Sequence, residues 1–376
     1  MKAAILKAVR KTIKATQSQA PHWPFFGKRG LFNTARTTRR YLSSIAATSG
    51  GATTGQPASP APKRGGVPRK IWFLADLAWE PGELIPELQK ICEVVVTDLH
   101  AANASSQPRE HTAEITRQAA AGVAPDLILL YAREGLLSQP LFDILRKAGA
   151  PIWGMNLDDK IDFFADEYSP YRARDGYSRW ACRFDLNLTS TRAIMESYTR
   201  LGANVEYFPE GFHLRPEFLL PRPQTAYPLS FVGAWREDRA EFIQALARDG
   251  LDVAAFGPGW PRGKAGQPWE IFRCSQISLG VGYSASSYLT SLKARDFECP
   301  GSGACYLTTY NWELSQQFEV GREILCYRNT DELVEMLTYY LPRPELCAEI
   351  AKAGFERAKR DHTWEQRFRT LFAKAY

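Results

Sequence analysis

Short apolar runs alternate with amphipathic segments along most of this chain. In the first half, residues 67–215, six such runs are rich in Val, Ile, Leu and aromatic residues. Runs of this kind between polar turns are typical of strands that are buried on both faces of a parallel sheet. The predicted strands are Lys70–Ala75, Glu93–Thr97, Asp126–Tyr131, Pro151–Asn156, Asp185–Thr189 and Val205–Phe208, with predicted helices at Glu83–Ile91, Gln139–Ala148 and Arg192–Leu201.

The same alternation starts again after the Pro-rich stretch Pro209–Pro223, which we interpret as a hinge. Alternating strands and helices predict two doubly wound α/β halves, and ligands of such sheets bind beyond the carboxyl ends of the strands. We therefore expect a binding cleft between the halves. The second half has predicted strands at Leu229–Gly233, Val253–Gly257, Ile277–Val281, Ala304–Thr309 and Glu323–Tyr327, and predicted helices at Asp238–Asp249, Thr330–Tyr340, Pro344–Arg360 and Thr363–Ala375.

The first 66 residues have a different composition. They hold six Lys and six Arg but no Asp or Glu, and Met1–Ala15 spaces Ile5, Val9 and Ile13 four residues apart. This spacing predicts a basic amphipathic helix, and Ala46–Gly66 is typical of a flexible linker. Three interpretations stay open: an arm within residues 1–45 that binds an anionic membrane or a partner, an organelle-targeting peptide, and a leader without a role.

The net charge of +6 comes from this extension, since the rest of the chain has 35 basic and 41 acidic residues. A mildly acidic body argues against nucleic acid as a partner. Seven cysteines show no C-x-x-C motif or zinc-site spacing, and no run of eighteen apolar residues occurs. We therefore expect a protein of a reducing compartment, cytoplasmic and peripheral on the inner membrane face if the extension binds lipid.

Candidate chemistry is densest in the stretch Ser291–Tyr327. Lys293 and Arg295 precede Glu298 on a predicted helix, and Gly301 and Gly303 follow where that helix ends. Cations can neutralise a diphosphate, while a carboxylate can accept hydrogen bonds from two ribose hydroxyls. The alternative is an ordinary surface ion pair on an α/β helix.

Four segments of the second half have a recognisable order and spacing. They are LSFVGAWREDRAEF, LKARDFECPGSGACYLTT, FEVGREILCYRNTDELVEML and AGFERAKRDHTWEQRF. With these segments the chain resembles group-1 type glycosyltransferases, which have two facing Rossmann-like domains (the GT-B fold), and most of all their spore-maturation-protein-like branch. NLDDKIDFF and FDLNLTSTRAIMESYTRLGANVEYFPEGFH in the first half match more loosely.

The resemblance implies a domain plan and a donor site. Residues 67–215 would hold the acceptor, residues 216–360 would hold a nucleotide-diphosphate sugar, and the helix in residues 361–376 would return to the N-terminal domain. Glu298 would bind the ribose hydroxyls, and Arg236 and Lys293 the diphosphate, with no metal ion and no cofactor. The residues expected to line this donor site are Gly233, Arg236, Lys293, Arg295, Glu298, Gly301, Gly303, Thr308 and Thr309.

The sequence departs from the family pattern at two positions. Thr290 stands where many relatives have the first carboxylate of an E-x7-E pair, and Thr309 stands where an acidic residue is usual. The leading expectation is a hexosyltransferase acting on the hydroxyl of a glycan, lipid-linked or protein acceptor. A non-catalytic nucleotide- or sugar-binding protein and a nucleotide-sugar epimerase of the same fold remain alternatives.

Asp158 and Asp159 are the catalytic candidates of the first half, because they follow a predicted strand and could orient or deprotonate an acceptor hydroxyl. The alternative is a helix N-cap with a solvated neighbour. Asp76 has the same two interpretations, and His213 would either meet the donor or pack. Core packing is also the alternative to sugar stacking for Trp79, Trp153 and Trp235. In the run Gly257–Pro261 a nucleotide base could rest against the backbone and Trp260, and a plain turn is the alternative.

Overall fold

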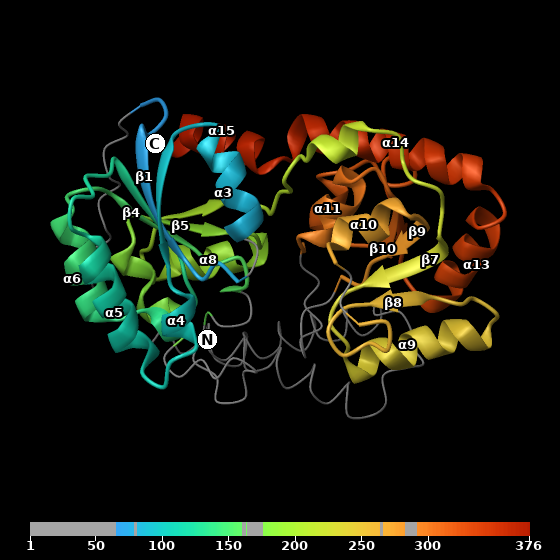
Figure 1. Cartoon of the computed structure of the whole chain (residues 1–376), viewed down its shortest axis with the longest axis horizontal. Coiled ribbons are helices and arrows are strands. Elements are labelled where there is room, and N and C mark those ends of the chain that lie inside the picture. Colours follow the sequence, from blue (N-terminus) through green and yellow to red (C-terminus); the bar gives the residue numbers. More distant parts are fainter. Residues whose placement is uncertain (1–64, 79–80, 160–162, 164–175, 264–265, 283–291) are drawn as a thin grey trace, which may run out of the picture. The chain divides into compact units, whose positions relative to one another are not determined.

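The computed structural model describes residues 65–376 with gaps at 79–80, 160–162, 164–175, 264–265 and 283–291 (Figure 1). The described residues divide into two compact units. The N-terminal unit holds the described residues up to Leu214. It also includes residues 292–297 and Lys359–Tyr376. The C-terminal unit holds the rest. The predicted helix at residues 1–15 and most of the predicted linker lie outside the described residues.

The N-terminal unit is built on a parallel sheet with the strand order β2-β1-β3-β4-β5-β6. Its strands are β1 (Lys70–Ala75), β2 (Glu93–Asp98), β3 (Leu127–Tyr131), β4 (Ile152–Met155), β5 (Leu186–Thr189) and β6 (Val205–Tyr207). Its helices are α3 (Pro81–Gln89), α4 (His100–Asn103), α5 (Pro108–Ala119), η1 (Glu134–Leu136), α6 (Gln139–Lys147), η2 (Tyr177–Arg179), η3 (Ala181–Arg183), α8 (Arg192–Arg200) and α15 (Trp364–Ala375).

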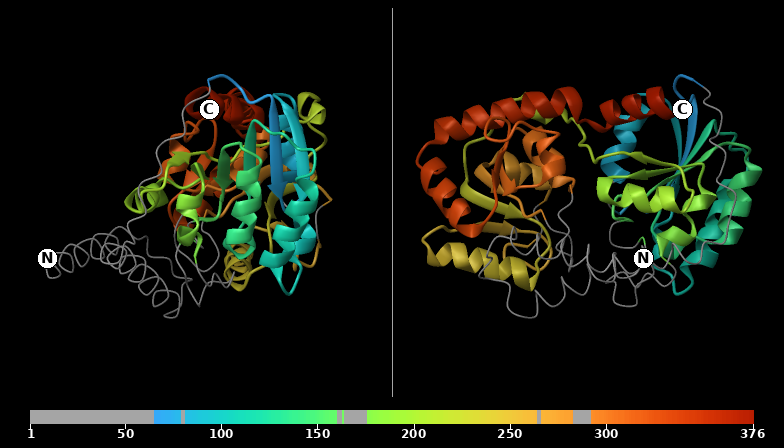
Figure 2. Two further views of the ribbon diagram at one scale, coloured as in Figure 1. Left: turned by 90° about the vertical axis from the view of Figure 1, so that its left-hand side faces the viewer. Right: turned by 180° about the vertical axis from the view of Figure 1, so that it is seen from behind.

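Side chains of β1 alternate between two buried faces of this sheet. Ile71 and Phe73 pack with residues of α3 and α15, whereas Trp72 is also fully buried and donates a hydrogen bond from Nε1 to Thr97 Oγ1 at 2.9 Å. Figures 1 and 2 show α5 and α6 on the other side of the sheet from α3 and α15. Both faces are therefore covered, as an apolar run without polar alternation requires.

The last helix, α15, completes the core of the N-terminal unit. Trp364, Phe368 and Phe372 are almost fully buried and belong to the same apolar core as β1 and α3. Thr363 caps the helix, since its Oγ1 accepts a hydrogen bond from Gln366 N at 3.1 Å. The aromatic stripe predicted from sequence thus covers the sheet of this unit.

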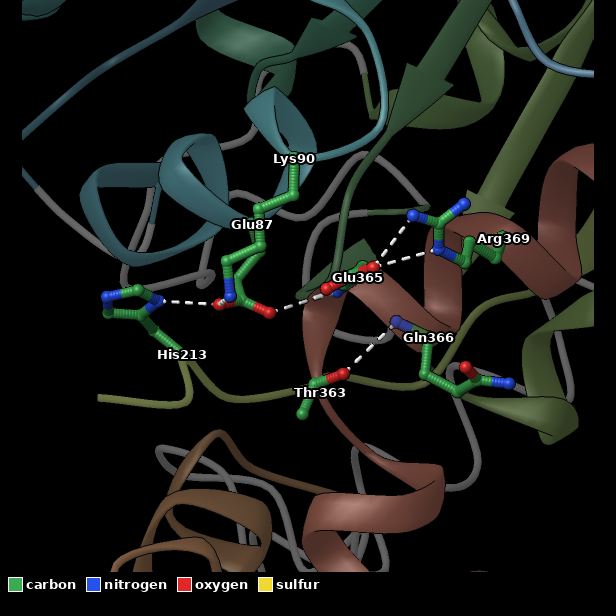
Figure 3. A network of polar contacts seen from close by, with 7 residues as sticks. All are labelled: Glu87, Lys90, His213, Thr363, Glu365, Gln366 and Arg369. Atoms are coloured by element: carbon green, nitrogen blue, oxygen red, sulfur yellow. Dashed lines mark hydrogen bonds and ion pairs between the residues drawn. The ribbon is translucent and has the colours of Figure 1, made fainter. Parts of the chain in front are cut away.

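Glu87 ties three segments of the N-terminal unit together (Figure 3). Its carboxylate is fully buried and contacts His213 Nδ1 at 2.8 Å, Lys90 Nζ and the backbone N of Glu365 at 3.4 Å. Burial raises the pKa of Glu87, but the hydrogen bonds from His213 and Lys90 outweigh it and leave the pKa below its usual value. The network fixes α3 against the start of α15.

The C-terminal unit has a second parallel sheet, with the order β11-β10-β9-β7-β8. Its strands are β7 (Tyr227–Val232), β8 (Ala254–Phe256), β9 (Ser275–Leu279), β10 (Cys305–Thr309) and β11 (Leu325–Tyr327). Its helices are η4 (Pro216–Leu219), α9 (Glu237–Arg248), α10 (Pro268–Arg273), α11 (Arg295–Gly301), α12 (Trp312–Ser315), α13 (Thr330–Tyr340) and α14 (Pro344–Asp361), of which α11 and α14 cross into the N-terminal unit.

One face of this second sheet forms the main apolar core. Phe231, Leu279 and Leu307 from three neighbouring strands pack with Leu333 of α13 and Ile350 of α14. The opposite face carries small hydroxyl side chains. On that face Ser275 Oγ donates a hydrogen bond to Ser230 Oγ at 2.8 Å, so the buried polar atoms pair with one another.

The predicted fold class, with two doubly wound parallel sheets, is confirmed. The sequence missed α5 and α10. In α5 the buried face is made of Thr112, Ala113 and Thr116 rather than large apolar residues, so the helix has no apolar periodicity to read. The short helix α10 starts at an unusual cap, because Gln267 forms the capping box with Glu270.

Candidate functional site

The carboxyl edge of the second sheet has a topological switch between β7 and β9. The chain runs from β7 outward to β8 and then returns to the other side of β7 to form β9. Loops that diverge at such a point leave a crevice where ligands of open α/β sheets bind. Gly233 follows β7 there, and Gly280 and Gly282 follow β9. The switch is therefore the natural candidate site of this unit.

Gly233 lies against the loop that follows β8. Gly257 has a φ of +130°, and a Cβ added to it would lie 2.3 Å from Gly233 O. The same oxygen accepts a hydrogen bond from Trp260 Nε1 at 2.8 Å. Trp260 is 9% exposed and packs in the apolar core, so little of its ring is open to the nucleotide base that the sequence suggested could rest there. Two glycines bring these loops close because no side chain separates them.

Arg236 precedes the first turn of α9 at this edge. Its guanidinium makes a two-pronged ion pair with Asp238, with Nε–Oδ1 at 3.1 Å and Nη2–Oδ2 at 2.9 Å. The side chain is 28% exposed, so it is held in a defined orientation yet open to a ligand. A guanidinium oriented in this way suits a phosphate oxygen. Trp235, one residue earlier, is also exposed.

Thr308 and Thr309 end β10, next to the switch, but they point in different directions along the strand. Thr309 Oγ1 accepts a hydrogen bond from Gly282 N at 3.3 Å, which ties β10 to the loop after β9. Thr308 is 1% exposed, and a Cβ on Gly280 would lie 2.4 Å from its Oγ1. Thr309 is therefore the threonine closer to the surface, while Thr308 faces the packed interior of the sheet.

Gly301 and Gly303 lie at the other end of β10. The helix α11 ends at Gly301, and Gly303 adopts a φ of +80° just before the strand begins at Cys305. Glycine is the residue that ends a helix in this conformation, so the predicted helix end explains Gly303. Because a five-residue strand spans about 16 Å, both glycines are far from the carboxyl edge. This geometry therefore gives no support to the expectation that Gly301 and Gly303 lie beside the donor.

The segment before α11 belongs to the N-terminal unit, which the sequence did not indicate. Lys293 N donates a hydrogen bond to Asp296 Oδ2 at 2.8 Å, and Asp296 is buried. In a capping box, the side chain three residues into the helix accepts a hydrogen bond from the backbone N–H of the N-cap residue. The Lys293–Asp296 contact resembles that bond and fixes the backbone of Lys293. Arg295 and Glu298 are three residues apart on α11, so they share one face of the helix.

Lys293 reaches the carboxyl edge of the first sheet. Its Nζ lies 3.7 Å from Asp158 Oδ1, and the two side chains are 25% and 40% exposed. The ion pair joins a predicted diphosphate ligand to a predicted acceptor-side carboxylate. Both groups are within reach of solvent, so the pair carries opposite charges at the edge where a ligand of this sheet would bind.

Asp158 and Asp159 differ in burial, although the sequence treats them alike. Asp159 is fully buried and accepts a hydrogen bond from Tyr198 Oη at 2.9 Å. A carboxylate in that position links β4 to α8 and has no surface from which to meet an acceptor. Asp158 is the half-exposed member of the pair.

The remaining candidates have structural contacts. Asp76 Oδ1 lies 2.9 Å from His100 Nδ1 and also accepts a hydrogen bond from Ala78 N. Burial raises the pKa of Asp76, but hydrogen bonds from Ala78 and Asn103 leave it lowered. His213 pairs with Glu87 at the carboxyl end of α3. Trp153 is buried against α15, while Trp79 and Thr290 lie outside the described residues.

Sequence reasoning missed Asp296, Gly280 and Gly282. Asp296 had a readable signal, since a carboxylate three residues after Lys293 at a helix start is the spacing of a capping box. The two glycines also had one, because G-x-G directly after an apolar run indicates close backbone approach. Among the described residues, no group of three His, Cys, Asp or Glu side chains could hold a metal ion. No described helix could cross a membrane.

Comparisons with known proteins agree with this fold. A family model described as glycosyl transferase-like matches residues 236–373. The structure of Anabaena Alr3699/HepE in complex with UDP and glucose superposes with a TM-score of 0.53 at 12% identity, covering 81% of this chain and 98% of that one. No curated protein sequence matches the chain.

TarM is a second structural neighbour, with a TM-score of 0.51 and 11% identity over 69% of this chain. The match covers 58% of TarM. A structure of the S. aureus TarM G117R mutant in complex with Fondaparinux, alpha-GlcNAc-glycerol and UDP has a TM-score of 0.50, with 11% identity over the same shares of both chains. At these identities the likeness concerns the fold, and the GT-B architecture expected from sequence is confirmed.

Proposed function

We propose that the protein is a glycosyltransferase that moves a sugar from a nucleotide-diphosphate sugar onto an acceptor hydroxyl. The observation that carries this proposal is the glycosyl transferase-like match over residues 236–373, which includes Arg236, Lys293, Glu298 and Thr309. Two of these residues, Arg236 and Thr309, belong to the switch of the second sheet. We also propose that within this group the chain is related to the spore-maturation-protein-like branch, which its sequence motifs resemble.

The donor roles follow from charge and position. Arg236 is the diphosphate ligand at the start of α9, where the helix N-terminus adds its own positive potential. The Glu298 carboxylate accepts hydrogen bonds from the ribose hydroxyls, with Arg295 three residues earlier on the same face of α11. In this proposal cations and backbone amides stabilise the leaving diphosphate without a metal ion. UDP is the first nucleotide to test, because HepE and TarM have structures in complex with UDP.

The acceptor role falls to Asp158 in this proposal. A half-exposed carboxylate at the end of β4 can accept a proton from, or orient, the hydroxyl of a glycan, lipid-linked or protein acceptor. Lys293 Nζ lies 3.7 Å from that carboxylate, and a ligand phosphate can compete with Asp158 for the ammonium group. Asp158→Asn should therefore lower turnover more than donor binding, whereas an unchanged turnover would remove Asp158 from the mechanism.

We also propose that the basic extension holds the enzyme on an anionic membrane surface, at the cytoplasmic face. The support is its composition, with twelve basic and no acidic residues up to Gly66. Such a placement suits a lipid-linked or surface-polymer acceptor.

A thermal-shift screen tests the donor site. The melting temperature of the protein is measured with each of UDP, GDP, ADP, CMP and dTDP. The same screen is then repeated with the Glu298→Ala variant. We expect one diphosphate to raise the melting temperature and the substitution to abolish most of that rise, because ligand binding stabilises the folded state. Glu335→Ala is the control, since Glu335 is an exposed carboxylate on α13 of the same unit.

Two results would count against the proposal. A nucleotide shift that persists in Glu298→Ala would move the donor site elsewhere. A shift without any sugar transfer to glycan or lipid-linked acceptors would favour the non-catalytic binding protein of the same fold.

A further inference from the structure

The first sheet has a topological switch of its own, between β1 and β3. The chain runs from β1 outward to β2 and then returns to the other side of β1 to form β3. Asp76 follows β1 directly at this point, and His100 lies two residues beyond the end of β2. Ala75 and Asp98, the last residues of these two strands, are paired in register. The two loops therefore leave the carboxyl edge side by side, where ligands of such sheets bind.

The carboxylate of Asp98 holds both loops at this edge. Its Oδ1 accepts a hydrogen bond from Leu77 N at 3.2 Å and another from His100 N at 2.9 Å. Leu77 is the residue after Asp76, so one carboxylate fixes the backbone beside Asp76 and the backbone of His100. The two side chains are thus brought together by the ends of two paired strands.

The imidazole of His100 and the carboxylate of Asp76 form a dyad. Asp76 Oδ1 lies 2.9 Å from His100 Nδ1 and accepts a hydrogen bond from Ala78 N at 3.0 Å. Its Oδ2 accepts a hydrogen bond from Asn103 Nδ2 at 2.7 Å. Burial raises the pKa of Asp76, but the hydrogen bonds that the carboxylate accepts outweigh it and leave the pKa below its usual value. Asp76 is therefore ionised at neutral pH.

This contact selects one tautomer of the imidazole. An ionised carboxylate can only accept hydrogen bonds, so Nδ1 carries the proton of the neutral ring and Nε2 keeps its lone pair. The side chain of His100 is 57% exposed, whereas that of Asp76 is 12% exposed. An imidazole that is open to solvent and is oriented by a largely covered carboxylate has the arrangement of a general base.

We propose that His100 is the general base that takes the proton of the acceptor hydroxyl, and that Asp76 is the positioning residue that holds it in the active tautomer. The inference rests on the glycosyltransferase function proposed above. It assigns the proton transfer to His100 and leaves Asp158, which follows a strand two places along the sheet from β1, to orient the acceptor.

The transfer step balances without a further reactant. The acceptor oxygen forms a bond to the anomeric carbon of the donor sugar, while the bond from that carbon to the diphosphate oxygen breaks. The electron pair of the broken bond leaves with the diphosphate. The hydroxyl proton passes to His100 Nε2, and the Asp76 carboxylate stabilises the imidazolium until the proton is released to solvent.

Sugar transfer from UDP-glucose to octyl glucoside, measured as UDP release by the full-length protein, tests the base. His100→Ala should lower kcat by about 10²–10⁴-fold, the usual contribution of general base catalysis. Added imidazole should restore part of this loss, because the exposed position admits a small base. His111→Ala is the matched control and should turn over as the parent does, since His111 is an exposed histidine on α5 of the same unit. The UDP-induced rise in melting temperature should be the same in both variants as in the parent.

Asp76→Asn tests the positioning role by a measurement that needs no substrate. Long-range ¹H–¹⁵N NMR at about pH 8, where imidazoles are mostly neutral, identifies the protonated ring nitrogen. The parent His100 should carry its proton on Nδ1. The variant should lose this preference together with part of kcat, because an amide can donate to the ring as well as accept from it.

The outcomes separate the dyad from the donor chemistry. An active parent with an unchanged kcat in His100→Ala would overturn the inference and leave the glycosyltransferase function in place. A parent His100 with its proton on Nε2 would overturn it without any assay of transfer. A parent that neither transfers sugar nor shows a nucleotide shift would remove the proposed function, and the inference with it.

Discussion

At the scale of single residues, Glu87 is the fully buried carboxylate at the centre of the network in Figure 3. A fully buried carboxylate is unfavourable unless hydrogen bonds and cations compensate for lost solvation. His213, Lys90 and the backbone N of Glu365 supply that compensation. Because Glu365 lies in the first turn of α15, one carboxylate links α3, the segment at His213 and the last helix.

Glu87→Gln should lower the free energy of unfolding by about 1–3 kcal/mol at neutral pH, since a neutral amide loses the charge-assisted contacts. The pKa of Glu87 is lowered in the folded protein, so its contribution is complete above the unfolded value of about 4.3 and is lost as the pH falls through the folded pKa. Denaturant unfolding from pH 3 to 7 measures this. The gap between parent and variant should narrow at the acidic end.

Glu93→Gln is the matched control for this prediction. Its side chain is 60% exposed and pairs with Lys70, so the change should be within about 0.5 kcal/mol at every pH. A parent–variant gap for Glu87→Gln that stays constant down to pH 3 would show that folding does not lower the pKa of Glu87.

At the scale of elements, α14 packs unusually close to the segment before β11. A Cβ added to Gly354 would lie 2.3 Å from Glu323 O and 3.4 Å from Pro300 Cβ. A backbone carbonyl cannot move aside as a flexible side chain can. The close packing therefore requires a residue without a side chain at this position. The requirement holds although glycine disfavours a helix by roughly 1 kcal/mol relative to alanine.

Gly354→Ala should thus lower the melting temperature, and we expect a loss of about 1–3 kcal/mol from overpacking. Gly82→Ala in α3 is the control, because nothing lies within 4 Å of a Cβ at that position and the helix preference of alanine acts alone. Thermal unfolding of both variants should give shifts of opposite sign. Equal positive shifts would mean that α14 can move away from Glu323.

At the scale of the whole molecule, charge is divided along the chain rather than mixed. The basic excess lies in the first 66 residues, which precede most of the described part, and the remaining chain is mildly acidic. An acidic body is repelled by an anionic surface, so any attraction to such a surface must come from the extension.

Co-sedimentation with vesicles measures this attraction. Full-length protein should bind vesicles that contain phosphatidylserine and release as salt rises, because each Lys or Arg near the surface contributes about 1 kcal/mol that ions screen. A chain starting at Val67 should stay in the supernatant. Equal binding of both chains, or binding to neutral vesicles alone, would refute the proposed membrane role.

The sequence by itself determined the order and class of the elements. Lys70–Ala75 and Thr330–Tyr340 were predicted with the bounds observed, because apolar periodicity reflects burial directly. It failed at α5, where threonines form the buried face, and at β9, which starts and ends two residues earlier than predicted. Local pattern records whether a residue is buried but not which residue it meets.

Only the tertiary structure decided which candidates lie together. The folded chain brings Lys293 beside Asp158 and places the buried Asp159 in a hydrogen bond with Tyr198. It also puts Gly303 at the opposite end of β10 from Thr309. These contacts depend on how strands are ordered and how helices cross them, and that information is spread over the whole chain rather than held in any one motif.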